Sequence, residues 1–334
     1  MIKMNILLLS GGMGKRLWPL TNQYTGKQYL KFLMDDKGNP ESMIQRIYRQ
    51  IRYVHSEANV VVITNEKQKS LVKEQLGEDV PIVIEPDARD TYPAVFLGTA
   101  YVHFVQKKNK DEAIIIIPVD AYVDNSYFQK FVDMESVLKR EDYSLVLMGI
   151  TPKYASSKFG YILSGQEELE YGCHRVNRFL EKPNKEKAEE LIQQGAKWNA
   201  GVFAFRLEYL LKRYAEVHSF EASLEKFMQM PKRSFDYEVV EHEERALMCV
   251  YNNIWSDLGT WDEFLENTEC SRNEKVIFGS EVSNTDVINC LEIPIVISGV
   301  NNAIVVAHDN GILIIDREKV EDLKTILDNE MEIE

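Results

Sequence analysis

A glycine-rich segment near the N-terminus combines backbone freedom with positive charge. The segment LLLSGGMGKRLWPLT, residues 7–21, places two adjacent cations directly after three glycines. Glycine lets the backbone approach a ligand closely, and a loop between a strand and a helix presents free N–H groups to an anion. The alternative is a tight structural turn. The residues expected to form the anion site are Leu9, Ser10, Gly11, Gly12 and Gly14, with Arg16 as its cation.

The spacing within this segment excludes two common phosphate-binding loops. The order G-G-x-G-K-R is not GxxxxGK[ST], and it is not the GxGxxG of dinucleotide sites. A nicotinamide-dependent oxidoreductase is therefore disfavoured, although such an enzyme would share the alternation of strands and helices described below.

Two aspartates at the ends of apolar segments suit a metal ion. Asp120 ends the expected strand AIIIIPVD, and Asp257 follows a tryptophan in WSDLG. If the two carboxylates converge at one edge of a sheet, they could hold Mg²⁺, which prefers oxygen ligands. The alternative role for Asp120 is a helix N-cap. A glycosyltransferase usually carries a DxD motif, and Asp120 and Asp124 do not have that spacing.

Charge and cysteine usage limit the class of partner. The 334 residues carry 53 acidic and 39 basic side chains, a net charge of -14, without a long Lys/Arg run. This balance disfavours nucleic acid and anionic membrane surfaces as partners. The apolar run near the N-terminus is short and indicates a first strand, and no segment predicts a membrane span. The cysteines are widely spaced without a CxxC pair, so we expect neither a disulfide nor a zinc site, which fits a reducing cytoplasm. They are Cys173, Cys249, Cys270 and Cys290.

The elements that would position these residues alternate between strand and helix. Near-continuous apolar strands separated by helical patterns predict an α/β fold, with a Rossmann-like, mostly parallel sheet covered on both faces. Ligands bind such sheets outside the carboxyl ends of the strands. The expected strands are NILLLS, NVVVIT, PIVIEP, AIIIIP and SLVLMGI, and the expected helices include ESMIQRIYRQIRYV, one from about Pro93, one near 127–139 and NKEKAEELIQQG.

The pattern changes beyond about residue 270. Short apolar strands there are separated by turn dipeptides such as Asn310-Gly311, and a helix is expected near 320–327. We therefore predict a catalytic domain over 1–269 and a small β-rich domain over 270–334. The apolar strands of the second domain suggest a homodimer.

The glycine-rich segment resembles the first loop of the sugar-1-phosphate nucleotidyltransferases, G-G-x-G-x-R-L-x-P-L followed by a lysine. The matching residues are Gly11, Gly12, Gly14, Arg16, Leu17, Pro19, Leu20 and Lys27. Trp18 and the Lys27-Gln28 pair look most like the mannose-1-phosphate guanylyltransferase branch. Further segments resemble this family in the same order along the chain: IEPDARDTYPA, IIPVDAYVD, FGYI, FLEKP, WNAGVFAF, SFDYEVVE and WSDLGTWDEF.

The resemblance implies a glycosyltransferase-A-like fold and nucleotidyl transfer. A sugar-1-phosphate oxygen would attack the α-phosphorus of a nucleoside triphosphate, and pyrophosphate would leave. A phosphate monoester is already a nucleophile, so this chemistry needs cations and Mg²⁺ and no catalytic His or Ser. By resemblance, Arg16 clamps the leaving phosphates, Lys27 neutralises phosphate charge, and Asp120 and Asp257 hold the Mg²⁺.

The resemblance also assigns the two substrate ends. On the sugar side, Lys182 would meet the sugar phosphate and Glu181 would accept from sugar hydroxyls, while Gly160, Asn199 and Gly201 line the pocket. On the nucleotide side the expected residues are Glu85, Asp90 and Thr91. Guanine offers two adjacent donors that a carboxylate can accept, so Glu85 and the branch motifs favour GTP.

Three departures from the family pattern bear on specificity. Ala121 replaces a His, Asp90 replaces an Asn, and Phe159 changes the G-Y-G-Y-I segment. They leave open another sugar or base. A non-catalytic module that binds nucleotide sugars is the rival from another class. The chain favours the enzyme because it retains Arg16, Lys27, Asp120, Lys182 and Asp257.

Overall fold

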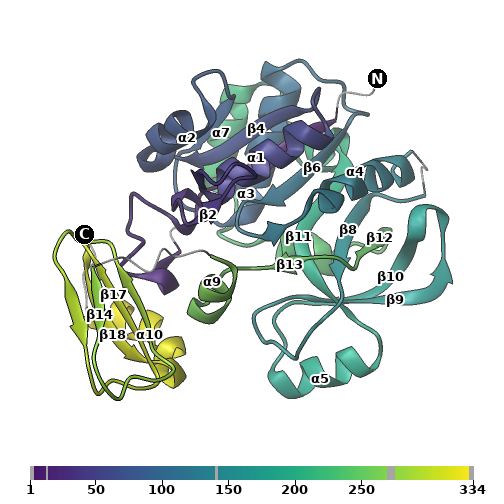
Figure 1. The fold of residues 1–334 in the computed structure, drawn as a ribbon. Helices are drawn as coiled ribbons and strands as arrows, with labels where there is room; N and C mark the ends of the chain where they lie inside the picture. The colour runs from purple at the N-terminus through teal and green to yellow at the C-terminus, as the bar shows by residue number, and fades with distance from the viewer. Residues whose placement is uncertain (1–3, 13, 140–141, 269–274, 331–334) are drawn as a thin grey trace.

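A nine-stranded sheet forms the centre of the protein (Figure 1). The computed structural model describes residues 4–12, 14–139, 142–268 and 275–330. The strand order is β5-β4-β1-β6-β11-β8-β12-β10-β9. The strands are β1 (Asn5–Leu9), β4 (Asn59–Asn65), β5 (Ile82–Glu85), β6 (Ala113–Pro118), β8 (Leu145–Ile150), β9 (Tyr161–Glu168), β10 (Cys173–Leu180), β11 (Lys197–Arg206) and β12 (Ala246–Tyr251).

Most strands of this sheet run in one direction, as the sequence predicts. β5, β4, β1 and β6 are parallel neighbours, and β12 is parallel to β8. β11 lies antiparallel to both β6 and β8, and β10 is antiparallel to β12 and β9. Because β11 runs backwards, its first residues lie at the same edge of the sheet as the last residues of β6.

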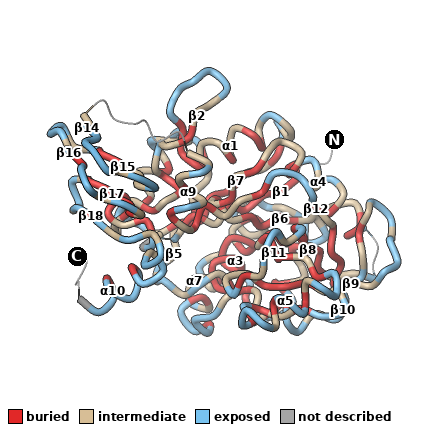
Figure 2. The backbone as a smooth tube through the Cα atoms, turned by 60° about the horizontal axis from the view of Figure 1, so that its bottom comes forward, coloured by how far each residue is buried: buried red, intermediate tan, exposed pale blue. Residues whose placement is uncertain are grey.

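Helices cover both faces of the sheet. In β1, Ile6 and Leu8 point into one core cluster and Leu7 points into the other, which explains the continuous apolar run. Figure 2 shows these central strands as the most deeply buried part of the chain. The first face carries α1 (Met43–Val54), α2 (Lys69–Leu76), α4 (Asn125–Val137) and α5 (Lys185–Gln193), and the second carries α3 (Thr91–Ala100), α6 (Leu207–Leu211), α7 (Phe220–Gln229) and α8 (Phe235–Glu238).

The helix ends follow local sequence signals. α1 begins after Ser42, whose side chain accepts from the Gln45 amide in a capping box. α3 begins at Thr91, two residues before the expected Pro93, because Asp90 caps it. Within the described ranges, no helix is long and apolar enough to cross a bilayer.

The C-terminal strands form two small sheets outside the central one. β14 (Val276–Phe278) pairs with β16 (Ile295–Ile297), and a three-stranded sheet has the order β15-β17-β18. Its strands are β15 (Asp286–Asn289), β17 (Ala303–His308) and β18 (Gly311–Asp316), and the chain continues through η8 (Arg317–Asp322) into α10 (Leu323–Glu330). α9 (Trp261–Asn267) ends just before this part. The predicted boundary at 269/270 lies outside the described residues.

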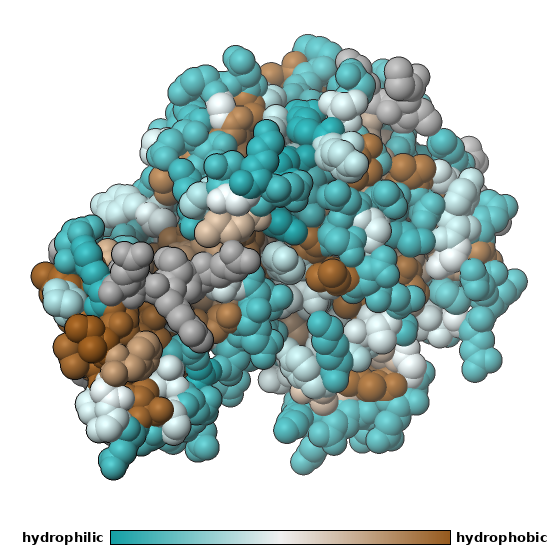
Figure 3. Space-filling view, in the orientation of Figure 1, coloured by the Kyte–Doolittle hydropathy of each residue, from teal (hydrophilic) through white to brown (hydrophobic). Residues whose placement is uncertain are grey.

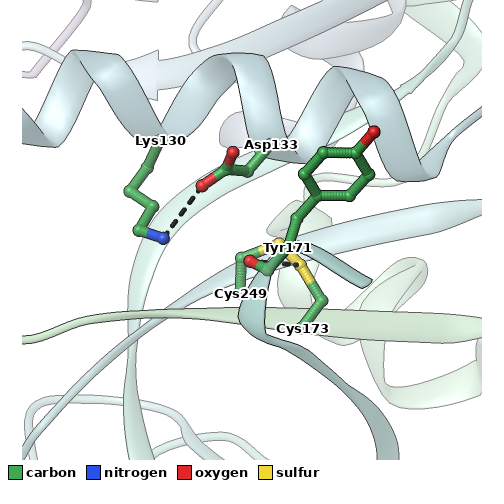
Figure 4. The surroundings of a disulfide bond; sticks show 5 residues. All are labelled: Lys130, Asp133, Tyr171, Cys173 and Cys249. Atoms are coloured by element: carbon green, nitrogen blue, oxygen red, sulfur yellow. Dashed lines mark hydrogen bonds and ion pairs between the residues drawn. A yellow bond between two sulfur atoms is a disulfide. The ribbon is translucent and has the colours of Figure 1, made fainter. Parts of the chain in front are cut away.

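The expectation of no disulfide is wrong. Cys173 and Cys249 are bonded, with Cα atoms 4.2 Å apart, and they face each other in the antiparallel pair β10 and β12 (Figure 4). The two residues are 76 positions apart in the chain. Their pairing depends on sheet topology, so cysteine spacing alone could not reveal it.

Candidate active site

A cleft of about 740 Å³ opens at the carboxyl ends of the parallel strands. Leu9, Asn65, Glu85 and Pro118, the last residues of β1, β4, β5 and β6, line it. This is the position expected for a ligand of an open α/β sheet. The sequence-predicted residues that line the cleft are Leu9, Ser10, Gly11, Gly12, Gly14, Arg16, Lys27, Glu85, Asp90, Thr91, Asp120, Gly160, Glu181, Asn199, Gly201 and Asp257.

Close approach at Gly11 and backbone conformation at Gly14 favour glycine in the first loop, whereas Gly12 has open space around it. A Cβ at Gly11 would lie 2.8 Å from the Glu85 carboxylate. Gly14 has φ +66°, and a Cβ there would lie 3.1 Å from the Lys27 amide nitrogen. The 3-10 helix η1 (Lys15–Leu17) follows and presents the exposed Arg16 at the cleft.

A buried polar network fixes this loop from below. The Ser10 hydroxyl is buried and hydrogen-bonds the Tyr29 hydroxyl at 2.8 Å. The Gln28 side-chain amide donates to the carbonyls of Ser10, at 3.1 Å, and Gly12, at 3.0 Å. The amide, carbonyl and hydroxyl of Ser10 are all engaged in hydrogen bonds within the protein, so Ser10 supports the loop. Gln28 was recognised in the sequence as a branch feature, but its supporting role needed the structure.

Lys27 lies between the two aspartates predicted to bind metal. Its Nζ is 2.9 Å from Asp120 Oδ2 and 3.4 Å from Asp257 Oδ1. Burial alone would lower the pKa of Lys27, but the two carboxylates raise it. Burial raises the pKa of Asp257, Lys27 opposes that rise, and the charge of Asp120 adds to it. The residue that caps α4 is Asp124, which accepts from the Ser126 amide, so the N-cap alternative for Asp120 is removed.

The two carboxylates fit a divalent cation that also binds phosphate. The carboxylate oxygens of Asp120 and Asp257 converge on Lys27 Nζ and are suitable metal ligands. Together the two carboxylates carry more negative charge than Lys27 balances. Across the described ranges, no group of three or more His, Cys, Asp or Glu side chains is placed to hold a metal. A Mg²⁺ ion bound here would therefore complete its octahedron with water and substrate phosphates, as this ion commonly does.

The nucleotide end of the cleft carries a carboxyl group with a raised pKa. Burial, with the charge of Asp90, raises the pKa of Glu85 to about 7. Asp90 has φ 67° and accepts from the Thr91 amide at 2.7 Å, so it caps α3. The Thr91 hydroxyl accepts from the Phe235 amide at 2.8 Å, which ties α3 to α8.

The opposite end of the cleft gathers polar side chains around Glu181. Asn199 Nδ2 donates to Asp236 Oδ1 at 2.6 Å, and Asn199 Oδ1 accepts from the Gly201 amide at 3.1 Å. Burial and the charge of Glu181 raise the pKa of Asp236 to about 7. Glu181 Oε2 is buried and has no hydrogen-bond partner within the described part of the chain. A Cβ at Gly160 would collide with that oxygen.

Lys182 and Asp236 differ from the sequence-based assignment. Lys182 does not line the cleft; its Nζ lies 2.5 Å from Glu181 Oε1, and it therefore acts on the cleft through Glu181. Asp236 lines the cleft, but no role was predicted for it from the sequence. The SFDYEVVE segment was the available signal.

Comparison with known proteins agrees with this geometry. The sequence pattern of the nucleotidyl transferase family matches residues 5–274. The mannose-1-phosphate guanylyltransferase RfbM of Salmonella typhimurium is 29% identical, over 96% of this chain and 71% of that protein. The alginate biosynthesis protein AlgA of Pseudomonas putida is also 29% identical, over 96% of this chain and 70% of its own length.

A solved structure supports the fold over almost the whole chain. A mannose-1-phosphate geranyltransferase from Thermus thermophilus superposes with a TM-score of 0.76 at 22% identity, covering 98% of this chain and 99% of that one. At this identity the likeness concerns the fold. Because the family pattern extends over most of the sequence and its glycine loop forms one wall of the cleft, the chain belongs to the nucleotidyl transferase family.

Proposed function

We propose that the protein transfers the guanylyl group of GTP to mannose-1-phosphate, giving GDP-mannose and pyrophosphate, with Mg²⁺ as cofactor. The observation that carries the proposal is the convergence of Lys27, Asp120 and Asp257 in the cleft beside the glycine loop. Several relatives are named mannose-1-phosphate guanylyltransferases, and these names support the choice of base and sugar.

The reaction joins two anions, so positioning and charge neutralisation dominate catalysis. An oxygen of the sugar phosphate forms a bond to the α-phosphorus, and the bond from that phosphorus to the β-phosphate oxygen breaks. Arg16, exposed at the cleft, neutralises the charge that develops on pyrophosphate. Lys27 lies between Asp120 and Asp257. Its positive charge there would neutralise the α-phosphate as the phosphate approaches the two aspartates. Bound Mg²⁺ would supply further charge stabilisation between the two phosphates.

The sugar hydroxyls meet a surface of hydrogen-bond acceptors. Glu181 Oε2 is a buried acceptor without a partner among the described residues, and the Asp236 carboxylate is held in place by Asn199. A pyranose offers several adjacent O–H donors that satisfy both groups, which removes the penalty for burying them unpaired. Lys182 orients Glu181 from outside the cleft.

The base is recognised by Glu85. This carboxyl lies against Gly11 at the end of β5. When ionised, it accepts from the N1–H and the exocyclic amine of guanine. Adenine and cytosine present an acceptor next to their amine, which would face a carboxylate oxygen unfavourably.

A substrate panel tests this proposal. The four ribonucleoside triphosphates and dTTP, each with mannose-1-phosphate and glucose-1-phosphate, are assayed for pyrophosphate release. We expect turnover with GTP and mannose-1-phosphate to exceed every other pair. Preference for another base or sugar phosphate would change the named substrate and retain the chemistry. Binding of GDP-mannose without turnover of any pair would indicate a non-catalytic binding module.

We also infer a homodimer and a cytoplasmic location. Exposed apolar side chains gather on the C-terminal domain, where Figure 3 shows brown surface. They include Ile277, Phe278, Val296, Ile312 and Ile314. A second copy would cover such a patch; a monomer by light scattering at micromolar concentration would contradict this. We infer the cytoplasmic location from the substrates, because nucleoside triphosphates are made in the cytoplasm. Cysteine usage does not support it, because Cys173 and Cys249 form a disulfide.

A further inference from the structure

The C-terminal domain shares a hydrophobic core with the glycine loop. Leu17 and Leu20, one and four residues after Arg16 in the chain, are each 1% exposed. They pack in one cluster with Ile304 of β17 and with Leu323 and Leu327 of α10. Figure 1 shows this contact as the purple N-terminal segment beside the yellow C-terminal domain. The backbone that carries Arg16 is thus held from one side by the C-terminal domain.

Polar contacts fix the register of this packing. Asn310 Nδ2 donates to the Pro19 carbonyl at 2.9 Å, and Asn22 Nδ2 donates to Asn310 Oδ1 at 3.1 Å. A Cβ at Gly311 would lie 2.6 Å from the indole ring of Trp18. The turn between β17 and β18 therefore fits closely against residues 18–22.

The same packing brings α10 to the rim of the cleft. Glu321, in η8, forms an ion pair of 2.9 Å with Lys158, which lines the cleft. The hydrogen bond and charge of Lys158 lower the pKa of Glu321, and the charge of Arg16 adds a smaller effect in the same direction. Lys324 lies three residues further along, on the same side as Glu321. Its side chain is exposed, lines the cleft and has no ion pair with any other described residue.

We propose that Lys324 of the C-terminal domain binds the β- and γ-phosphates of the nucleoside triphosphate, together with Arg16. The inference rests on the proposed nucleotidyl transfer but does not depend on the identity of the base or sugar. In the proposed function, the nucleoside lies by Glu85 and Gly11, and the α-phosphate lies by Asp120 and Asp257, all of which line the cleft. The triphosphate must therefore extend toward Arg16, where Lys324 stands at the rim. The C-terminal domain is then part of the catalytic unit.

Direct binding to the full-length protein tests this proposal. The affinities of GTP, GMP, inorganic pyrophosphate and mannose-1-phosphate are measured by calorimetry with Mg²⁺ for wild type, Lys324→Ala, Lys324→Arg and the control Lys319→Ala. Lys319 is an exposed cation of η8 that does not line the cleft. We expect Lys324→Ala to weaken GTP and pyrophosphate about fivefold to tenfold and to leave GMP and mannose-1-phosphate within twofold. Arginine should restore most of the loss.

The outcomes separate this proposal from the proposed function. Pyrophosphate is common to every nucleoside triphosphate, so a different base or sugar in the substrate panel would leave the pyrophosphate result valid. Unchanged GTP and pyrophosphate affinities in Lys324→Ala would overturn the role of Lys324 while turnover by the wild type stands. Equal weakening of GMP and GTP, weakening of mannose-1-phosphate alone, or wild type that binds no pyrophosphate would also overturn it.

Discussion

At the scale of single residues, the cleft shows how one lysine and two aspartates can serve both structure and chemistry. Lys27 keeps two partly buried carboxylates close together. Two like charges at this distance would otherwise repel strongly. Because Lys27 Nζ occupies the point where the two carboxylates converge, a metal ion that binds both of them displaces the ammonium, which is then free to meet a phosphate.

Removing either carboxylate should abolish most of the activity without unfolding the protein. Asp257→Asn and Asp120→Asn keep the side-chain shape but lose charge toward Mg²⁺, so we expect the barrier to rise by several kcal/mol, on the order of 10²-fold to 10⁴-fold in kcat. Pyrophosphate release is measured at saturating Mg²⁺. Asp133→Asn, on α4 and paired with Lys130 (Figure 4), is the control. Near-normal turnover by Asp257→Asn would contradict the metal assignment.

The raised pKa of Asp236 predicts a pH dependence on the sugar side. Only the ionised carboxylate is a pure acceptor, so the KM for mannose-1-phosphate should fall as pH rises through about 7. Because mannose-1-phosphate titrates as well, the profile of wild type is compared with that of Asp236→Asn. The difference between them should inflect near pH 7, and the KM for GTP should change much less. Identical profile shapes would show that Asp236 does not meet the sugar.

The same raised pKa has the opposite consequence for stability. The folded state holds the proton on Asp236 more tightly than the unfolded state does, so the stabilising effect is complete below the unfolded pKa of about 4. It is lost as pH rises toward 7. Urea titrations at pH 5 and pH 8 should therefore show a smaller fall in the free energy of unfolding for Asp236→Asn than for wild type.

At the scale of elements, the sequence predicts features that depend on residues close together in the chain, such as loops and helix caps. Gly11 and Gly14 could be recognised because they lie in a loop that follows a strand and carries cations. The cap of α3 is equally local, since Asp90 accepts from the amide of the next residue, Thr91. The reversal of β11 could not be recognised, because it depends on which strands it meets. Asp236 belongs to the same class, since its role arises from α8 packing beside Asn199 of β11.

The disulfide is the clearest long-range feature, and it predicts a stability effect without a catalytic one. Cys173 and Cys249 join β10 to β12 and do not line the cleft. Cys173→Ala should lower the free energy of unfolding of the oxidised protein by about 2–4 kcal/mol, with kcat/KM unchanged. Denaturant titrations with and without reductant measure this. Equal stability of wild type and variant under oxidising conditions would mean that the bond does not form in solution.

At the scale of the whole molecule, two domains meet at the residues that matter most for nucleotide binding. Leu17 and Leu20 share a core with the C-terminal domain, and Arg317 of η8 pairs with Asp262 of α9, which follows the segment of Asp257. Complete burial of a leucine side chain stabilises a fold by roughly 1.5–3 kcal/mol, and the C-terminal domain supplies part of that burial for Leu17 and Leu20. A disturbance of the C-terminal domain is therefore transmitted to the glycine loop.

A wedge at the domain contact should test this coupling. In Gly311→Val, the new side chain meets the Trp18 ring, so the turn of β17 and β18 must move away from the segment that follows Arg16. We expect the KM for GTP to rise severalfold and the thermal midpoint to fall by a few degrees, while the KM for mannose-1-phosphate stays nearly constant, because Glu181 and Asn199 belong to the other end of the cleft. Asp309→Asn changes an exposed residue of the same turn that lies outside the apolar patch, and it serves as the control. A fall in the thermal midpoint with an unchanged KM for GTP would restrict the C-terminal domain to a stabilising role. An equal rise in the KM values for GTP and mannose-1-phosphate would indicate a general distortion of the cleft.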